Sequence, residues 1–213
     1  MKVTGVFCRA VVCACVLVSA AFAQEGRRFN FSAGAGVSFP TGNASSSLNT
    51  GWNMDFRGGF NPSPGLLLDL DFSYNHWGLS DSTLAQFGEP GGFGDVWSLT
   101  FAPTMRLAPH AKFDPYIIAG FGLYHRGVSL TQPATVPTII CDPFFGFCYP
   151  AAVSVNQVVA SFSTYKPGFN VGGGIEFGIH GPVKVFAEAR YNDMFATHGT
   201  DLTYVPLTFG LRW

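Results

Sequence analysis

The chain lacks the features that mark two familiar classes of protein. After the first 23 residues it has no apolar run of about 18 residues, so no helix there is apolar enough to cross a bilayer. Charged residues make up only 12% of the chain, about half of what a soluble domain carries. The formal net charge of -1, without a basic cluster, argues against a nucleic-acid partner. Hydrophobic residues nevertheless reach 47%, and apolar composition without apolar runs predicts alternating strands.

The first 23 residues have the composition of an export signal. Lys2 and Arg9 form a short basic region, and an apolar stretch over residues 10–18 follows it. That stretch is too short to span a bilayer, and the small residues Ala21 and Ala23 precede Gln24 as in a cleavage site. We therefore expect residues 1–23 to be a secretory signal peptide, cleaved between Ala23 and Gln24. A retained anchor helix needs a longer apolar run.

Removal of this leader leaves two of the five cysteines, Cys141 and Cys148. An even pair in an exported chain favours a disulfide bond. A metal site is disfavoured, because a closed tetrahedral site requires four ligands and no histidine lies between the two cysteines. No cofactor is expected.

Eight segments alternate apolar with small or polar side chains, which is the period of a strand with one apolar face. Each has about the length of a tilted transmembrane strand. The segments are residues 29–39, 51–60, 66–77, 96–107, 115–126, 162–179, 183–193 and 205–213.

Short and long connections alternate between these segments. Tight turns are predicted at residues 61–65, 108–114 and 180–182, and longer loops at residues 40–50, 78–95, 127–161 and 194–201. An even number of strands with short turns at one end and long loops at the other is typical of an outer-membrane barrel. The predicted fold class is all-β: an eight-stranded antiparallel up-and-down transmembrane β-barrel domain over residues 24–213.

A soluble eight-stranded barrel of the lipocalin type is the structural alternative, with its apolar face turned inward around a ligand. The polar face of this chain is rich in glycine and serine and carries charges of both signs, which suits a filled lumen better than a solvated exterior. Aromatic residues near the strand ends also indicate interfacial girdles. These residues are Phe29, Phe39, Trp52, Phe60, Trp77, Trp97, Tyr191 and Trp213.

The last segment places apolar side chains at every second position and ends on an aromatic residue: Val205, Leu207, Phe209, Leu211 and Trp213. Pro115-Tyr116 leading into Gly120-Phe121-Gly122, and the run 185–191, are further motifs. On these residues the chain resembles the eight-stranded outer-membrane protein β-barrel family, of the OmpA type and related porin-like domains. The resemblance implies that the last segment is the C-terminal signal read by the barrel-insertion machinery. The peptidoglycan-binding domain of OmpA-type relatives has no counterpart here, so anchoring through such a domain is not implied.

Charged residues on the small face of the second and third segments are expected to pair. If the turn between these segments is centred on Ser63, Arg57 lies opposite Asp69 and Asp55 lies opposite Asp71, all pointing inward. Charge in a narrow lumen is costly unless it is paired. We therefore expect Arg57 and Asp69 to form an ion pair inside the barrel.

A second tight turn, centred on Gly181, extends the same reasoning. It places Gly174 opposite Glu188 and Gly172 opposite Arg190, so a glycine leaves room beside each long charged side chain. Since an eight-stranded barrel is only wide enough to be filled by its own side chains, these charges should plug it. The predicted lumen charge cluster comprises Asp55, Arg57, Asp69, Asp71, Glu188 and Arg190.

Catalytic residues are not predicted. Eight-stranded barrels that modify lipid A need a nucleophile and a base, such as a histidine and a serine two residues apart on a strand. None of the five histidines has a serine two positions on, and His198 with Thr200 and Asp201 is the closest arrangement. An isolated loop histidine is more often a solvated surface residue.

The leading hypothesis for function is a non-enzymatic structural or surface-interaction barrel that makes contacts through its long loops. Its expected partners are outer-membrane lipid and lipopolysaccharide, the barrel-insertion machinery, and a surface partner at the loop 127–161; a monomer is expected. Phe144, Phe145, Phe147 and Tyr149 give that loop an aromatic tip. A lipid A-modifying or lipid-hydrolysing enzyme and a small-solute channel remain alternatives.

Overall fold

The structure is a computed structural model that describes residues 29–213 apart from residues 110, 182 and 196–200. The expected leader and its cleavage site lie outside these ranges. Eight strands are present: β1 (Phe29–Thr41), β2 (Gly51–Ser63), β3 (Leu66–Gly78), β4 (Gly91–Arg106), β5 (Phe113–Cys141), β6 (Cys148–His180), β7 (Val183–Met194) and β8 (Leu202–Arg212). A 3-10 helix η2 (Gly42–Ser46) follows β1, and a helix α2 (Asp81–Phe87) follows β3. In the described ranges, no helix is long and apolar enough to cross a membrane.

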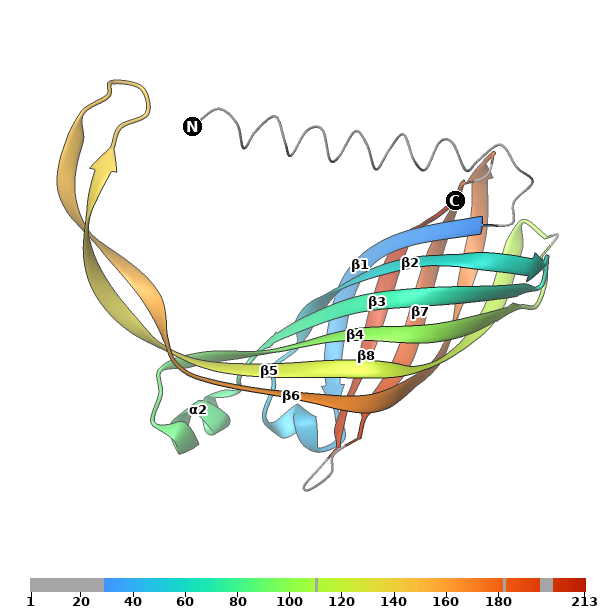
Figure 1. Cartoon of the computed structure of the whole chain (residues 1–213), viewed down its shortest axis with the longest axis horizontal. Helices are drawn as coiled ribbons and strands as arrows, with labels where there is room; N and C mark the ends of the chain where they lie inside the picture. The colour runs from blue at the N-terminus through green and yellow to red at the C-terminus, as the bar shows by residue number, and fades with distance from the viewer. Residues whose placement is uncertain (1–28, 110, 182, 196–200) are drawn as a thin grey trace.

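The eight strands form one closed antiparallel barrel in chain order (Figure 1). Closure is made by β8 against β1, from Ser32 opposite Arg212 to Thr41 opposite Thr203. The ladder reaches the last residue, because the backbone N–H of Trp213 donates to Phe31 O at 2.9 Å and Phe31 N–H donates to Trp213 O at 3.0 Å. The predicted fold class is confirmed.

The barrel is apolar outside and polar inside. Phe56, Leu70 and Phe121 are each more than half exposed on the outer surface. The buried side chains of the lumen instead include many polar and charged groups, among them Asp69, Asn75, Thr100, Thr104, Asn170 and Glu176. This arrangement excludes the soluble lipocalin-type alternative, because a water-soluble barrel would place its apolar face inward.

The register between β2 and β3 differs from the sequence prediction by two residues. Arg57 lies opposite Asp71, and Asp55 lies opposite Ser73, so the predicted pairings with Asp69 and Asp71 are wrong. The difference arises at the turn, which the sequence predicts to be centred on Ser63. Ser63 instead pairs with Leu66, and the ladder contains a register shift between Phe60 and Ser63. Between β6 and β7 the predicted register is confirmed, with Gly174 opposite Glu188 and Gly172 opposite Arg190.

The segment 127–161, predicted to be a loop, is mostly strand. β5 and β6 continue as a two-stranded ribbon until Cys141 lies opposite Cys148, with one register shift between Leu130 and Thr131. Figure 1 shows this ribbon curving away from the barrel beyond the end that carries η2 and α2. The alternation of the segment is broken by prolines and by that shift, so the period-two pattern does not reveal the strands. We call residues 131–158 the outer hairpin.

Trp77 does not lie in an interfacial girdle, so the sequence prediction for this residue is wrong. Its odd number places it on the same face of β3 as Asp69 and Asp71, and its side chain is 1% exposed. Its Nε1 donates to Ser38 O at 3.2 Å, and its ring packs edge-on against Tyr204 with centroids 5.0 Å apart. Trp77 therefore belongs to a buried apolar layer that closes the loop end of the lumen: Ala44, Trp77, Val96, Tyr124, Met194, Leu202 and Tyr204.

Candidate functional site

The centre of the lumen holds a cluster of buried charges around Arg57. Its guanidinium donates to Glu188 through two parallel bonds, Nη1 to Oε2 at 2.9 Å and Nη2 to Oε1 at 2.6 Å. Its Nε lies 2.8 Å from Asp55 Oδ1 and 3.1 Å from Asp71 Oδ2. Strands β2, β3 and β7 thus converge on one guanidinium, and the bidentate contact is the strongest geometry for this pair.

Arg190 closes the cluster from the other side. Its Nη2 lies 2.6 Å from Asp71 Oδ2 and 3.6 Å from Asp55 Oδ2, and its Nε donates to Glu188. The structure therefore brings together five of the six predicted lumen residues: Asp55, Arg57, Asp71, Glu188 and Arg190. Three carboxylates around two guanidinium groups leave the cluster with a formal charge of −1.

Two aromatic rings fill the space beside these charges. Tyr116 Oη donates to Glu188 Oε2 at 2.7 Å, and the Arg57 guanidinium lies 5.2 Å from the centre of the Phe186 ring. Glycines make room for both rings: a Cβ on Gly174 would lie 2.6 Å from Tyr116 Oη, and one on Gly34 would lie 2.9 Å from Phe186 Cζ. The polar, glycine-rich face therefore accommodates the groups that plug the lumen.

Asp69, the sixth predicted residue, lies outside this cluster. It accepts a hydrogen bond from Asn30 Nδ2 at 2.9 Å, and its Oδ2 lies 4.0 Å from Arg212 Nη2. The structure shows no ion pair between Asp69 and Arg57 among its described residues, which follows from the register difference between β2 and β3. Asp69 instead joins a second charge cluster, at the end of the barrel with the tight turns.

The second cluster centres on Glu176 and Asp114. Arg106 Nε lies 2.6 Å from Asp114 Oδ2, and Lys184 Nζ lies 3.1 Å from Glu176 Oε2. Arg212 Nη1 also donates to Glu176. Three acidic and three basic residues therefore balance one another at this end: Asp69, Asp114, Glu176, Arg106, Lys184 and Arg212.

Sequence reasoning did not assign the second cluster, although a signal for it exists. Side chains alternate between the two faces of a strand, so odd and even residue numbers lie on opposite faces. Each member of the cluster has the odd or even number of the lumen-facing residues of its strand, as Asp69 does on β3 and Arg212 on β8. Asp114 lies one residue before the predicted start of its strand, so the sequence pattern did not assign it to the lumen face. Which charges on that face meet depends on the stagger of β4, β6 and β8, and the sequence pattern alone does not give that stagger.

At the loop end, a cavity of about 260 Å³ lies above the apolar layer. Trp77, Val96 and Leu202 line it from the barrel, Ala44 from η2, and Phe87 from α2. A β-bridge between Leu48 and Leu79 ties the two outer connections together beside it. The cavity is mostly apolar, and three residues of the buried apolar layer form its lining on the barrel side.

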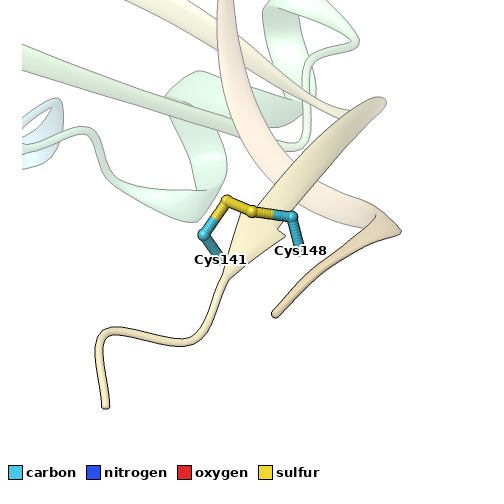
Figure 2. Close-up of a disulfide and its surroundings, with 2 residues drawn as sticks. All are labelled: Cys141 and Cys148. Atoms are coloured by element: carbon cyan, nitrogen blue, oxygen red, sulfur yellow. A yellow bond between two sulfur atoms is a disulfide. The ribbon is translucent and has the colours of Figure 1, made fainter. Parts of the chain in front are cut away.

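The outer hairpin ends in a disulfide and an aromatic tip. Cys141 and Cys148 are disulfide-bonded, as the sequence predicted (Figure 2). Phe144, Phe145 and Phe147 lie in the loop that the bond closes and are 90%, 77% and 72% exposed, values that are unusual for side chains of this size. The tip therefore presents apolar surface that nothing in the described structure covers.

The loop between the two cysteines is shaped by Asp142. Its Oδ1 accepts from the backbone N–H of Phe144 at 2.7 Å and of Phe145 at 3.0 Å. Its own N–H donates to Phe147 O at 2.8 Å, while Gly146 adopts a φ of 71° that favours glycine. These bonds hold the tip in one turn with its rings pointing outward.

The histidines that the structure describes do not form a catalytic arrangement. His125 lies between Trp97 and Tyr165, with ring centroids at 5.3 and 4.5 Å, and His76 packs beside Phe93 at 5.3 Å. These side chains belong to the aromatic belt at the loop end of the outer surface. His198 lies outside the described residues, and the described ranges hold no group of three potential metal ligands.

The side chains of the predicted C-terminal signal lie on the outer face of β8. Leu207, Phe209, Leu211 and Trp213 are between 36% and 55% exposed, and Val205 is half-buried. Ala35 lies opposite Phe209 on β1, and Ala187 lies opposite it on β7, so small side chains flank the ring. These apolar side chains therefore face the lipid, on the strand that closes the barrel.

Comparison with solved structures places the fold among outer-membrane barrels. Neisserial surface protein A has a TM-score of 0.57 and 16% identity, over 88% of this chain and 98% of its own. A major outer membrane protein from Thermus thermophilus has a TM-score of 0.51 and 12% identity, over 87% of this chain and 98% of its own. No curated protein sequence shows significant similarity to the chain.

A family assignment follows from the sequence itself. The profile of the "Outer membrane protein beta-barrel domain" family matches residues 10–213, which includes every strand of the barrel. The inverted polarity of the barrel, its alternation of short turns and long connections, and its solved structural relatives agree with this match. The chain therefore belongs to the outer membrane protein β-barrel family, whose members reside in the bacterial outer membrane.

Proposed function

We propose that the chain is a non-catalytic surface-contact protein of the outer membrane. The barrel acts as the anchor, and the outer hairpin acts as the contact element. The observation that carries this proposal is the tip, where Phe144, Phe145 and Phe147 are between 72% and 90% exposed on a loop closed by the disulfide. Large apolar side chains held in such a position indicate a contact with another surface.

The tip has two properties of a binding element. Exposed aromatic side chains release water over a large area when they are covered, and they dominate many interfaces for that reason. The disulfide and the bonds of Asp142 fix the tip before contact, so less conformational entropy is lost on binding. A mainly apolar partner suits it, either a protein surface or the lipid A layer of lipopolysaccharide.

Two features of the lumen support an anchoring role over a channel. Ion-paired side chains fill the barrel at two levels, around Arg57 and around Glu176. The apolar layer with Trp77 and Tyr204 closes the loop end above them. An eight-stranded barrel has little room left once such groups occupy it.

Export and insertion complete the proposal. Residues 1–23 would direct secretion and be removed before Gln24. Val205, Leu207, Phe209, Leu211 and Trp213 would be recognised by the barrel-insertion machinery, which is consistent with their place on the closing strand. The solved relative with the higher TM-score of the two, Neisserial surface protein A, is named as a surface protein, and we propose the same location for the contact element here.

A hairpin deletion tests the proposal against its alternatives. Residues 132–157 are replaced by a two-residue Asn-Gly turn, since Gln132 lies opposite Gln157. The deleted and full chains are compared for adhesion of whole cells and for binding to lipopolysaccharide vesicles. We expect the deletion to abolish contact and leave the barrel folded. Equal binding would contradict the proposal, phospholipid or lipid A turnover by the purified chain would favour an enzyme, and steady conductance would favour a channel.

A further inference from the structure

The outer hairpin has two free edges. β4 pairs with β5 only as far as Thr131, and β7 pairs with β6 only from Gly168 onward. Among the described residues, no strand pairs with the outer sides of the hairpin. Each side therefore presents a row of backbone N–H and C=O groups, and such a row recruits another strand unless the edge is protected.

The edge formed by β5 is protected by prolines. Pro133 lies opposite Asn156, and Pro137 lies opposite Ala152. Since proline has no N–H, it occupies the pairs of an antiparallel ladder whose amide nitrogens point away from the partner strand. Both prolines thus remove donors from the outer row of β5. Gln132 Nε2 also donates to Glu89 Oε2 at 2.7 Å, which ties the base of this edge to the connection after α2.

The edge formed by β6 is open between two protected points, since Pro150 removes a donor opposite Ile139 and the register shift leaves Val159 without a partner on β5. The same register makes Ala152, Ser154 and Asn156 the residues whose N–H and C=O groups point outward. All three are exposed, and residues 151–160 contain neither proline nor a charged residue. Residues 151–157 carry none of the usual protections of an edge, a lysine, a proline or a bulge, so this stretch of β6 contrasts with the matching stretch of β5, which holds two prolines.

We infer that residues 151–157 of β6 pair with the same segment of a second copy, antiparallel, about a two-fold axis. This pairing joins two hairpins into one four-stranded sheet. The inference rests on the proposed function, because it names the partner of the contact element. Asp142 is the single charged residue between positions 128 and 165, so two copies approach along this edge without charge repulsion. A two-fold contact is self-complementary and closes after two subunits.

The same arrangement gives the aromatic tip a neighbour. Pairing centred on Ser154 places Cys148, where β6 begins, opposite Ala160 of the other copy, so the tip at residues 142–147 lies beside the start of the segment that follows Ala160. Phe162 and Tyr165 in that segment are 59% and 62% exposed. Backbone pairing and aromatic contact would therefore reinforce each other, as they do between cross-strand pairs within one sheet.

Two proline variants test the inference, because Thr135 on β5 lies directly opposite Ser154 on β6. Ser154→Pro and Thr135→Pro alter the same rung of the hairpin and block opposite edges. Each full chain is folded in detergent and studied by sedimentation equilibrium. We expect a dimer for the wild type and for Thr135→Pro, and a dissociation constant for Ser154→Pro raised by about tenfold or more. Equal behaviour of the two variants would overturn the inference.

A cross-linking experiment checks the register. Antiparallel pairing about Ser154 brings this residue next to its own copy, so Ser154→Cys should form an intermolecular disulfide on mild oxidation, mapped by mass spectrometry. Thr135→Cys is the control and should remain unlinked. A wild type that is monomeric at all concentrations, together with a Ser154→Cys variant that remains unlinked, would overturn the inference. The proposed function would then still stand if hairpin deletion abolished adhesion, and it would fall separately if deletion had no effect.

Discussion

Arg57 on β2 binds Glu188 on β7 through two parallel hydrogen bonds across the lumen of the barrel. The two residues are 131 positions apart in the chain, and their contact links strands that are not neighbours in the sheet. The pair therefore stabilises the barrel by a side-chain contact across the lumen, in addition to the backbone hydrogen bonds between neighbouring strands.

Removal of Arg57 should destabilise the barrel strongly. Arg57→Ala leaves Glu188, Asp55 and Asp71 without their shared guanidinium, and loss of one partner of a buried pair costs about 3 to 5 kcal/mol. Lys112→Ala, in the exposed turn before β5, should cost about 1 kcal/mol or less. The free energy of unfolding in detergent measures both. Similar losses would mean that the lumen charges are not coupled as described.

The glycines of β6 provide a second test of the packed lumen. A Cβ on Gly174 would lie 2.5 Å from Ala187 O and 2.6 Å from Tyr116 Oη, whereas a Cβ on Gly178 would have no atom within 4 Å. Gly174→Ala should therefore lower the unfolding free energy by about 1 to 3 kcal/mol. Gly178→Ala, in the same strand, should leave it almost unchanged. If Gly174→Ala changed the unfolding free energy as little as Gly178→Ala, the lumen would be loosely filled.

Assembly should depend on the outer face of the closing strand. The double variant Phe209→Ala and Trp213→Ala removes two aromatic side chains from β8, which must be recognised and then closed against β1. We expect the heat-modifiable folded form to disappear from the outer membrane. Phe121→Ala with Leu123→Ala removes two exposed apolar side chains from β5 and serves as the control. Normal folding of the β8 variant would refute the role of this strand.

The disulfide should affect the hairpin and not the barrel. In the chain-entropy model, closing so short a loop contributes about 2 to 3 kcal/mol, confined here to the tip of the hairpin. Cys141→Ser with Cys148→Ser should leave the unfolding of the barrel unchanged and speed proteolysis within the hairpin. Non-reducing mass spectrometry of the exported wild type should find the bond, and free thiols at both positions would contradict it.

The sequence predicts the barrel well because one rule, alternation, governs every transmembrane strand. The same rule predicts which residues face the lumen, so five of the six expected charges meet in one cluster. Alternation does not predict how far each strand is shifted along its neighbour. Arg57 lies opposite Asp71 and not Asp69 because the turn around Ser63 sets β3 two residues away from the predicted register.

The outer hairpin escapes sequence prediction for a different reason. Its strands lie beyond the barrel and are exposed on both faces, so no burial selects one face as apolar. Pro133 and Pro137 are also typical of loops, although here they protect an edge. Alternation arises where one face of a strand is buried and the other is not. Neither face of this ribbon is buried, so its sequence does not alternate.

The aromatic tip should make the contact that the outer hairpin provides. Phe144, Phe145 and Phe147 are changed together to serine in the full chain, which keeps the disulfide, Asp142 and the barrel intact. Adhesion of whole cells that display equal amounts of folded protein is then measured against the wild type. We expect the triple variant to lose adhesion to the level of the hairpin deletion. Adhesion equal to that of the wild type would contradict this role of the tip.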